Sequence, residues 1–241
     1  NLRATTGTDA RTGGGTSDHG NRVATGMRAE RQQARHRQIA DAAYALLQSE
    51  GYRATSMLAI ARQAGASNET LYRWYGNKQG LFRTLVEDNA AEVRDLLQAR
   101  LAEDASPLAA LSEMAPLLLQ LVTGPRAVAL NRAAAADVND TATLGQTIAA
   151  SGRETVVPLI GAQIARLHQS GDLCGATVAE MAETFVGLLI GDLQIRRVIG
   201  VIDPPDSAEC ERRAGRAISQ LVSLYGPDHP AATGAAAMAP D

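Results

Sequence analysis

Apolar residues recur every three or four positions along most of the chain, which is the spacing that buries one face of an α-helix. The first such stripe predicts a helix over residues 33–49 and consists of Ile39, Ala42, Ala43, Leu46 and Leu47. Further stripes predict helices over residues 78–101, 107–123, 126–138, 141–151, 154–169, 177–199 and 207–225. No segment alternates like a half-buried strand. The pattern therefore predicts an all-α fold of about nine helices.

Capping and helix-breaking residues separate these stripes. Ser106-Pro107 has the order of an N-cap followed by a first-turn proline, and Gly124-Pro125 breaks the chain before the next helix. Thr141 is expected to cap the helix over residues 141–151. Thr177 and Glu180 form the sequence of a capping box at the start of the helix over residues 177–199.

The composition agrees with closely packed helices. Hydrophobic residues make up 45% of the 241 residues but aromatic residues only 3%, so Ala, Leu and Val are expected to fill the core. No apolar run reaches the ~18 residues of a membrane span, and the first residues lack the apolar segment of a signal peptide. We therefore expect a cytoplasmic protein without membrane contact. Cys174 and Cys210 form no CxxC motif, and no metal site or cofactor is expected.

Charge is distributed unevenly. Residues 1–85 carry 12 Lys and Arg against 6 Asp and Glu, whereas residues 86–241 carry 11 against 20. This asymmetry fits a protein that meets a polyanion with its N-terminal part only. Residues 1–30 are predicted to form a disordered basic arm, which either lies along phosphates or is a flexible tail. Residues 227–241, rich in Ala, Gly and Pro, are predicted to form a disordered tail.

Residues 56–81 have an order that fits one specific arrangement. A first short helix is predicted to end at Gly65, which adopts the left-handed conformation without a Cβ clash. Ser67 can cap a second short helix, with Thr70 at its third position. The apolar faces of the two helices are Ala59, Ile60 and Ala64 in the first, and Leu71, Trp74 and Tyr75 in the second. Two short helices across a glycine turn form a helix-turn-helix.

The outer side of the second short helix carries polar groups: Asn68, Glu69, Thr70, Tyr72 and Arg73. Such groups can read base edges and hold phosphates in a major groove, although an ordinary solvated helix face has a similar composition. Lys78 follows at the first turn of the next helix, where a cation opposes the helix dipole. A lysine in this position suggests an external anion, most simply a phosphate.

The motif residues are Ile60-Ala61, Ala64-Gly65-Ala66-Ser67, Thr70-Leu71-Tyr72-Arg73, Asn77-Lys78 and Leu81. In this order, the stretch from about Ala34 to Leu85 resembles the DNA-binding domain of TetR/AcrR-type transcriptional repressors. The resemblance implies a helix-turn-helix domain over residues 31–85 and a helical ligand-binding and dimerisation domain over residues 86–226. The residues expected to contact double-stranded DNA are Arg35, Thr55, Ser56, Ser67, Asn68, Glu69, Thr70, Tyr72, Arg73, Trp74 and Lys78.

The helices over residues 177–199 and 207–225 are apolar around much of their surface. The resemblance implies that they form a four-helix bundle with a second copy of the chain, giving a homodimer. The alternative is that they are buried within one subunit. The residues expected at the interface are Phe185, Leu188, Leu189, Ile195, Ile218, Leu221 and Val222.

The helices between residues 96 and 169 carry many Leu, Val, Ala and Met residues, which is consistent with an apolar cavity for a small-molecule effector. The candidate residues are Met114, Leu118, Leu121, Asn131, Arg132, Gln163 and Phe185. Each of them is also an ordinary core or surface residue type. The spacing of these residues does not indicate which ligand binds.

The leading hypothesis is a repressor that binds a palindromic operator as a homodimer and is released by a small apolar or amphipathic effector. An enzyme is the second hypothesis, but no paired carboxylates, phosphate loop or nucleophile triad can be assembled from the sequence. The third is a ligand-binding or scaffold protein whose helix-turn-helix no longer reads DNA. Glu69 supports this third hypothesis because it places an acidic group toward the groove, although Glu can also accept from cytosine.

Overall fold

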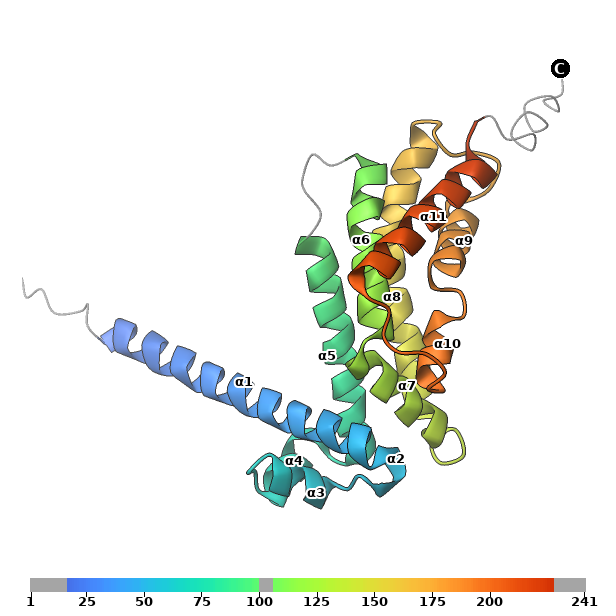
Figure 1. Ribbon diagram of the computed structural model, residues 1–241. Coiled ribbons are helices and arrows are strands. Elements are labelled where there is room, and N and C mark those ends of the chain that lie inside the picture. Colours follow the sequence, from blue (N-terminus) through green and yellow to red (C-terminus); the bar gives the residue numbers. More distant parts are fainter. Residues whose placement is uncertain (1–16, 100–105, 228–241) are drawn as a thin grey trace, which may run out of the picture.

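The computed structural model describes residues 17–99 and 106–227. These residues form eleven helices and no strand (Figure 1). The predicted all-α fold is therefore confirmed. Residues 1–16 of the predicted arm and residues 228–241 of the predicted tail lie outside the described ranges.

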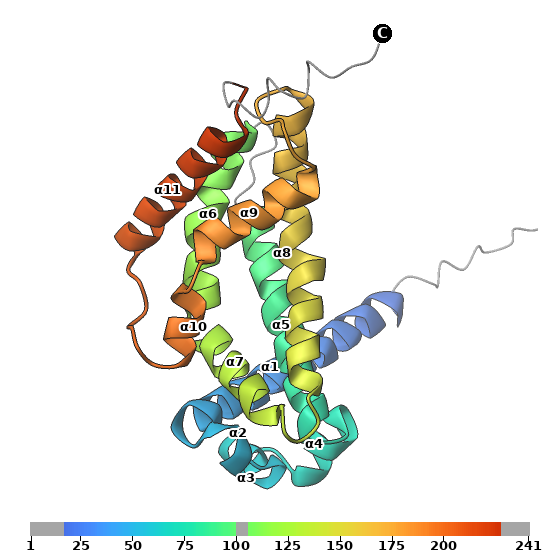
Figure 2. The same ribbon diagram turned by 90° about the vertical axis from the view of Figure 1, so that its right-hand side faces the viewer.

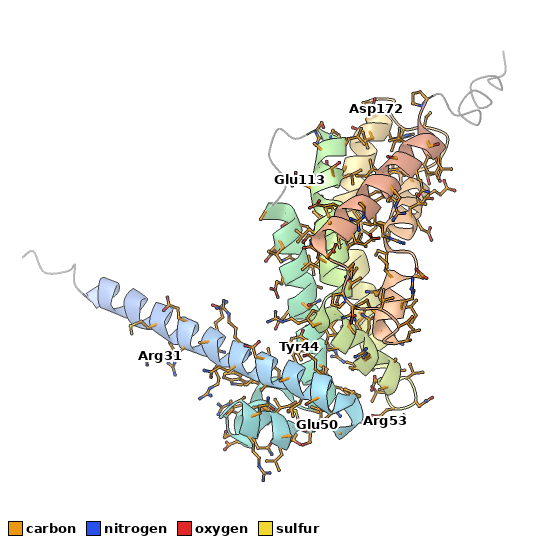
Figure 3. All side chains as sticks on the ribbon, in the orientation of Figure 1. Arg31, Tyr44, Glu50, Arg53, Glu113 and Asp172 are labelled. Carbon is orange, nitrogen blue, oxygen red and sulfur yellow. The ribbon has the colours of Figure 1, made fainter. Side chains whose placement is uncertain are left out.

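Four helices form the N-terminal end of the molecule: α1 (Ser17–Ser49), α2 (Gly51–Ala54), α3 (Met57–Gln63) and α4 (Asn68–Tyr75). The predicted start of the first helix near residue 33 is wrong, because α1 already begins at Ser17 and so includes half of the predicted disordered arm. No proline interrupts this stretch, and residues 27–32 are all types with high helix propensity. The early part of α1 projects away from the other helices, and exposed Arg31 lies on it (Figure 3).

The remaining helices are α5 (Lys78–Ala99), α6 (Pro107–Thr123), α7 (Pro125–Asp137), α8 (Thr143–Gln169), α9 (Val178–Ile190), α10 (Leu193–Val198) and α11 (Ser207–Tyr225). The bounds of α6 and α11 agree with the predicted ones. Ser106 caps α6 by accepting from the amide of Ala109, and the capping box of Thr177 and Glu180 opens α9.

One long helix, α8, replaces the two helices predicted over residues 141–151 and 154–169. Thr141 does not cap it. Instead, Asp137 accepts from the backbone amides of Thr143 and Leu144, and the Thr141 hydroxyl donates to the same carboxylate. A carboxylate near unpaired amides stabilises a helix start, so Asp137 connects the end of α7 to the beginning of α8.

Two helices, α9 and α10, replace the single helix predicted over residues 177–199. The chain turns at Gly191, which has a φ of 49°. Arg213 of α11 donates to the carbonyls of Leu189 and Ile190, and its guanidinium lies where a side chain at Gly191 would be. The break is therefore stabilised by a residue from another helix, which caps the end of α9.

The helices enclose two hydrophobic cores, and α5 belongs to both. Its first half contributes Leu81, Phe82, Leu85 and Val86 to the core around α1, α3 and α4, whereas Val93 and Leu97 belong to the core of α6, α8, α9 and α11. Residues of α7 also enter the first core. Figure 2 shows α5 and α8 running together from the N-terminal helices toward the opposite end.

No single helix in the described ranges is both long enough and apolar enough to cross a membrane. Only α6 and α7 taken together reach that length and composition, and they are bent by 51° where they meet. Core helices also have these properties, and both α6 and α7 contribute buried residues to the cores.

We expect Asp137→Ala to lower the free energy of unfolding by about 2–4 kcal/mol at neutral pH, because buried amides lose their acceptor. Burial acts to raise the pKa of Asp137, but hydrogen bonds from Thr141, Leu144 and Thr143 outweigh it and hold the pKa below the ordinary value. A depressed carboxylate pKa stabilises the fold above the unfolded-state pKa. The difference between wild type and variant should therefore shrink as the pH falls below about 4.

Chemical denaturation at several pH values measures this difference. The control is Asp140→Ala, because the Asp140 side chain is exposed. An Asp137→Ala variant as stable as this control at pH 7 would contradict the assigned role of Asp137.

Candidate functional site

The helix-turn-helix is held by side-chain caps and one glycine. Ser56 accepts from the amide of Ala59 at the start of α3, and Ser67 accepts from the amide of Thr70 at the start of α4, each at 3.1 Å. Gly65 between them has a φ of 60°. The two exposed serines therefore have a structural role in addition to any contact with DNA.

Three side chains of α4 face the protein. Leu71 is completely buried. The ring of Trp74 stacks on His36 of α1 with 4.3 Å between centroids, and Nδ1 of His36 lies 2.8 Å from the Tyr75 hydroxyl. Burial, together with the charge of Asp88, raises the pKa of Tyr75 to about 12, so this phenol remains a neutral hydrogen-bonding group. These contacts fix the orientation of α4 on α1.

The other side of α4 faces outward, as the sequence predicted. Asn68, Glu69, Tyr72 and Arg73 are all exposed, and Tyr72 retains 50% of its accessible surface. None of the four side chains has a hydrogen-bond or ion-pair partner within residues 17–99 and 106–227. Thr70 is half-buried, and its hydroxyl lies 2.8 Å from that of Ser67. The outward group thus consists of an amide, a carboxylate, a phenol and a guanidinium on one short helix.

Three other residues expected to contact DNA, Thr55, Arg35 and Lys78, make hydrogen bonds within the protein. Thr55 is only 1% exposed and donates to the Gly51 carbonyl, so the prediction of a side-chain contact is wrong for this residue. Arg35 donates through one nitrogen to the carbonyls of Ala64 and Gly65, so it clamps the turn between α3 and α4.

Lys78 is also directed at the protein. Its ammonium donates to the Tyr52 carbonyl and lies 4.0 Å from the centroid of the Tyr52 ring. Burial lowers the pKa of Lys78, against the opposing charges of Asp140 and Asp137. The Tyr52 hydroxyl in turn lies 3.5 Å from the Asp137 carboxylate. Lys78 therefore joins the start of α5 to α2 and, through Tyr52, to the end of α7.

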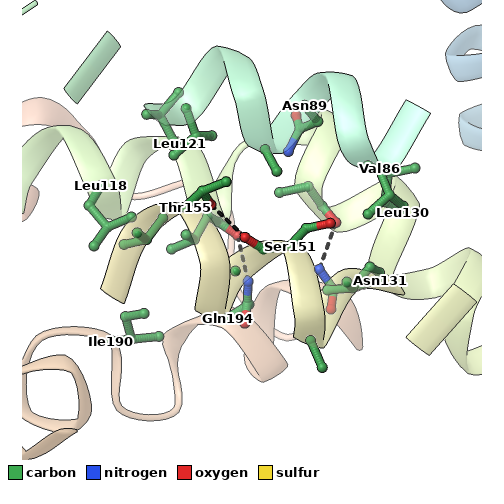
Figure 4. A pocket seen from close by; sticks show the side chains of 18 of the residues that line it. Val86, Asn89, Leu118, Leu121, Leu130, Asn131, Ser151, Thr155, Ile190 and Gln194 are labelled. Atoms are coloured by element: carbon green, nitrogen blue, oxygen red, sulfur yellow. Dashed lines mark hydrogen bonds between the residues drawn. The ribbon is translucent and has the colours of Figure 1, made fainter. Parts of the chain in front are cut away.

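A cavity of about 400 Å³ lies in the second part of the molecule, between α5, α6, α7, α8, α9 and α10 (Figure 4). Most of its lining is aliphatic. The polar lining residues are Asn89, Asn131, Ser151, Thr155 and Gln194. No charged and no aromatic side chain is among the described residues that line it.

Three of the seven candidate ligand residues line this cavity: Leu118, Leu121 and Asn131. The other four do not. Met114 and Phe185 are buried in the core, Gln163 accepts from Arg166, and Arg132 is exposed and donates to the carbonyl of Val198. These four residues thus belong to helices that line the cavity, but they are not among the lining residues.

Sequence reasoning missed the polar residues Asn89, Ser151, Thr155 and Gln194. A signal for Asn89 was present, because it lies four residues after Leu85 and four before Val93, in the middle of the buried stripe of α5. A polar residue within an apolar stripe often has a partner or faces a cavity.

The residues expected at a dimer interface fall into two groups. Phe185, Leu189 and Leu221 are buried in the core of the subunit itself, so the prediction that they contact a second copy is wrong. Leu188 and Ile218 are half-buried, and Ile195 and Val222 are exposed. The three buried residues occupy the side of α9 and α11 that faces the core. Only the half-buried and exposed residues are available to a partner.

Comparisons with known proteins agree with this architecture. The family model for bacterial regulatory proteins of the tetR family matches residues 39–85, and the model for the C-terminal domain of AefR-like transcriptional repressors matches residues 109–227. The uncharacterized HTH-type transcriptional regulator YvkB of Bacillus subtilis (strain 168) is 38% identical over 63 residues, or 26% of this chain. That alignment spans 33% of YvkB, about a third of this curated relative.

Solved structures resemble the chain over most of its length. A TetR-family transcriptional regulator from Mesorhizobium loti MAFF303099 is 26% identical, with a TM-score of 0.70 over 81% of this chain and 98% of that one. The flavonoid-responsive regulator FrrA has the same fold, with 24% identity and a TM-score of 0.62 over 81% of this chain and 99% of that one. The helix-turn-helix and the helical C-terminal part are thus both matched, and the chain belongs to the TetR family of DNA-binding transcriptional regulators.

Proposed function

We propose that the protein is a repressor that binds a palindromic operator as a homodimer and leaves it when a small effector fills the cavity. The observation that carries this proposal is the outward face of α4, whose unpartnered polar side chains lie on a helix fixed by its opposite face. Such a rigid polar helix suits the major groove. Because the proposed partner is DNA, we also propose that the protein acts in the cytoplasm.

The side chains of α4 divide into two roles. Tyr72 and Arg73 are suited to phosphate oxygens, because a hydroxyl and a guanidinium donate hydrogen bonds. Asn68 and Glu69 at the start of α4 are suited to base edges, where an amide can pair with adenine and a carboxylate can accept from cytosine. Ser56 and Ser67 are exposed and Thr70 and Trp74 are half-buried, so these four remain candidates for phosphate contacts. Arg35 and Lys78 act instead by positioning α3 and α5.

A dimer is proposed because one helix of eight residues meets too few bases for tight specific binding. The side of α9 and α11 away from the core offers the half-buried Leu188 and Ile218 and the exposed Val222 to a second copy. Two α4 helices held about 34–36 Å apart would read two half-sites one turn of DNA apart.

The helices that line the cavity suggest how an effector would release the protein from DNA. Val86, Asn89, Ala90 and Val93 of α5 form one wall, and the same helix contributes Leu81 and its neighbours to the core of the helix-turn-helix. Leu130 of α7 both lines the cavity and belongs to that core. A ligand that prefers a shifted position of α5 and α7 would move α4, and two displaced α4 helices cannot both occupy their half-sites.

We expect Arg73→Ala to weaken binding to any duplex and to lower the slope of log K against log salt by about one unit. Lys78→Met is the matched comparison. It also removes one cation, but the Lys78 ammonium contacts Tyr52 and does not face outward as Arg73 does. It should lower stability and leave the slope nearly unchanged. Asn68→Ala should instead alter the preferred base at one position by about 1–3 kcal/mol.

Operator fragments for this titration come from selection of genomic DNA bound by the purified protein. Equal salt slopes for wild type and Arg73→Ala would contradict the assigned phosphate contact. Wild-type protein that binds no duplex at low ionic strength would favour the scaffold hypothesis.

We expect Val222→Asp to dissociate the dimer, because a carboxylate would be buried against apolar side chains of the partner. Sedimentation at micromolar concentration should show wild-type dimer and variant monomer, and only the dimer should bind both half-sites of the palindrome. Ser223→Asp is the control. Ser223 is exposed, and this substitution adds the same negative charge at the position next to Val222. A monomeric wild type at that concentration would contradict the dimer.

A further inference from the structure

The lining of the cavity limits the charge of its ligand. No Asp, Glu, Lys, Arg or His is among the described residues that form the wall. A charged ligand group would leave water without gaining an ion-pair partner, which is strongly unfavourable in apolar surroundings. The described part of the wall therefore disfavours carboxylates, phosphates and ammonium groups.

Three arginines on the neighbouring helices, Arg126, Arg132 and Arg197, are engaged with other groups of the protein. Arg126 pairs with Glu92 at 2.9 Å and with Asp41 at 3.4 Å. Arg132 donates to the Val198 carbonyl, and Arg197 donates to the carbonyls of Thr123 and Ile202. Turning any of them toward a ligand anion would break these interactions. They do not supply a counter-charge without that cost.

The polar lining residues offer a defined set of hydrogen bonds. The Asn131 amide nitrogen donates to the Ala127 carbonyl, and the Gln194 amide nitrogen donates to the Val122 carbonyl, which leaves each amide oxygen as an acceptor (Figure 4). The side chains of Asn89 and Ser151 have no partner within residues 17–99 and 106–227. These two can donate as well as accept. The set suits an uncharged group such as a hydroxyl or a carboxamide.

The rest of the wall is aliphatic, with Val93, Leu118, Leu121, Val156 and Ile190 among its members. The absence of aromatic rings from the described wall residues removes the stacking surface that would favour a planar ligand. A volume of about 400 Å³ is at the lower end for pockets that hold small molecules. A compact or short-chain aliphatic body fits this space better than a long acyl chain with a large headgroup.

We propose that the effector is an uncharged, mainly aliphatic molecule whose hydroxyl or amide group is held by Asn89, Asn131 and Ser151. This inference rests on the proposed function in taking the cavity as the effector site. It goes further in assigning the chemical class of the ligand and in naming Asn89, whose side chain has no partner within residues 17–99 and 106–227, as a residue that holds the ligand's polar group.

Four probes with the same ten-carbon chain test the class: decan-1-ol, decanamide, decanoate and decylammonium. Calorimetric titration of the full-length protein at pH 7 compares their affinities, with the neutral probes below their solubility limits and the ions below their micelle concentrations. The alcohol and the amide should bind at least about tenfold more tightly than either ion. Charged probes that bind as tightly as the neutral ones would overturn the inference, and so would the failure of all four probes to bind.

A variant that introduces a negative charge tests the assigned residue. Asn89→Asp should bind decylammonium at least about tenfold more tightly than wild type does and should lose affinity for decanamide. Asn139→Asp is the matched control, because Asn139 is exposed in the turn after α7 and does not line the cavity. An unchanged order of probe affinities in folded Asn89→Asp protein would overturn the role of Asn89. If the variant does not fold, the wild-type probe series still decides the ligand class.

Operator binding separates this inference from the proposed function. Protein that binds operator DNA but prefers charged probes would retain the repressor proposal and lose the ligand class. Protein that binds decanamide but no duplex would retain the ligand class and lose the repressor proposal.

Discussion

The packing of α5 into two cores is the constraint on which the rest of the structure depends. Leu81, Phe82 and Leu85 are buried with the helix-turn-helix, and Val93 and Leu97 are buried with the C-terminal helices. The part of α5 that lines the cavity runs from one group to the other, through Val86, Asn89, Ala90 and Val93. Close-packed side chains transmit small displacements, since a core has little free volume in which to absorb them. A ligand in the cavity thus acts on a helix that also positions α4.

A second connection runs beside α5. Asp137 ends α7 and caps α8, and it lies within 3.5 Å of the Tyr52 hydroxyl, while Lys78 holds the Tyr52 carbonyl and ring. Burial and the neighbouring Asp137 raise the pKa of Tyr52 to about 12, which keeps this phenol protonated near neutral pH. The start of α5 is therefore held between the DNA-binding helices and the end of α7. Lys78 stabilises this junction, a role distinct from the phosphate contact that its position in the sequence suggests.

The elements that could be predicted from sequence are those that depend on nearby residues. The bounds of α6 and α11, the capping box of α9 and the outward face of α4 all follow from periodicity and caps within one or two turns. Two of the elements predicted wrongly depend on residues outside their own helix. Arg213 stabilises the break at Gly191 from another helix, and Asp137 caps α8 from six residues before Thr143. The inward direction of Phe185 and Leu189 likewise depends on how α9 packs against its neighbours.

Native-state hydrogen exchange on a Leu97→Ala variant tests the shared role of α5 most directly. Leu97 is completely buried in the second core, so its truncation should leave a cavity and cost about 2–5 kcal/mol. If α5 couples the two cores, the opening free energy should fall at the amides of residues 81–86 and of α4 as well as at residues 93–97. A loss of protection confined to residues 93–97 and the C-terminal helices, with α4 unchanged, would contradict the coupling.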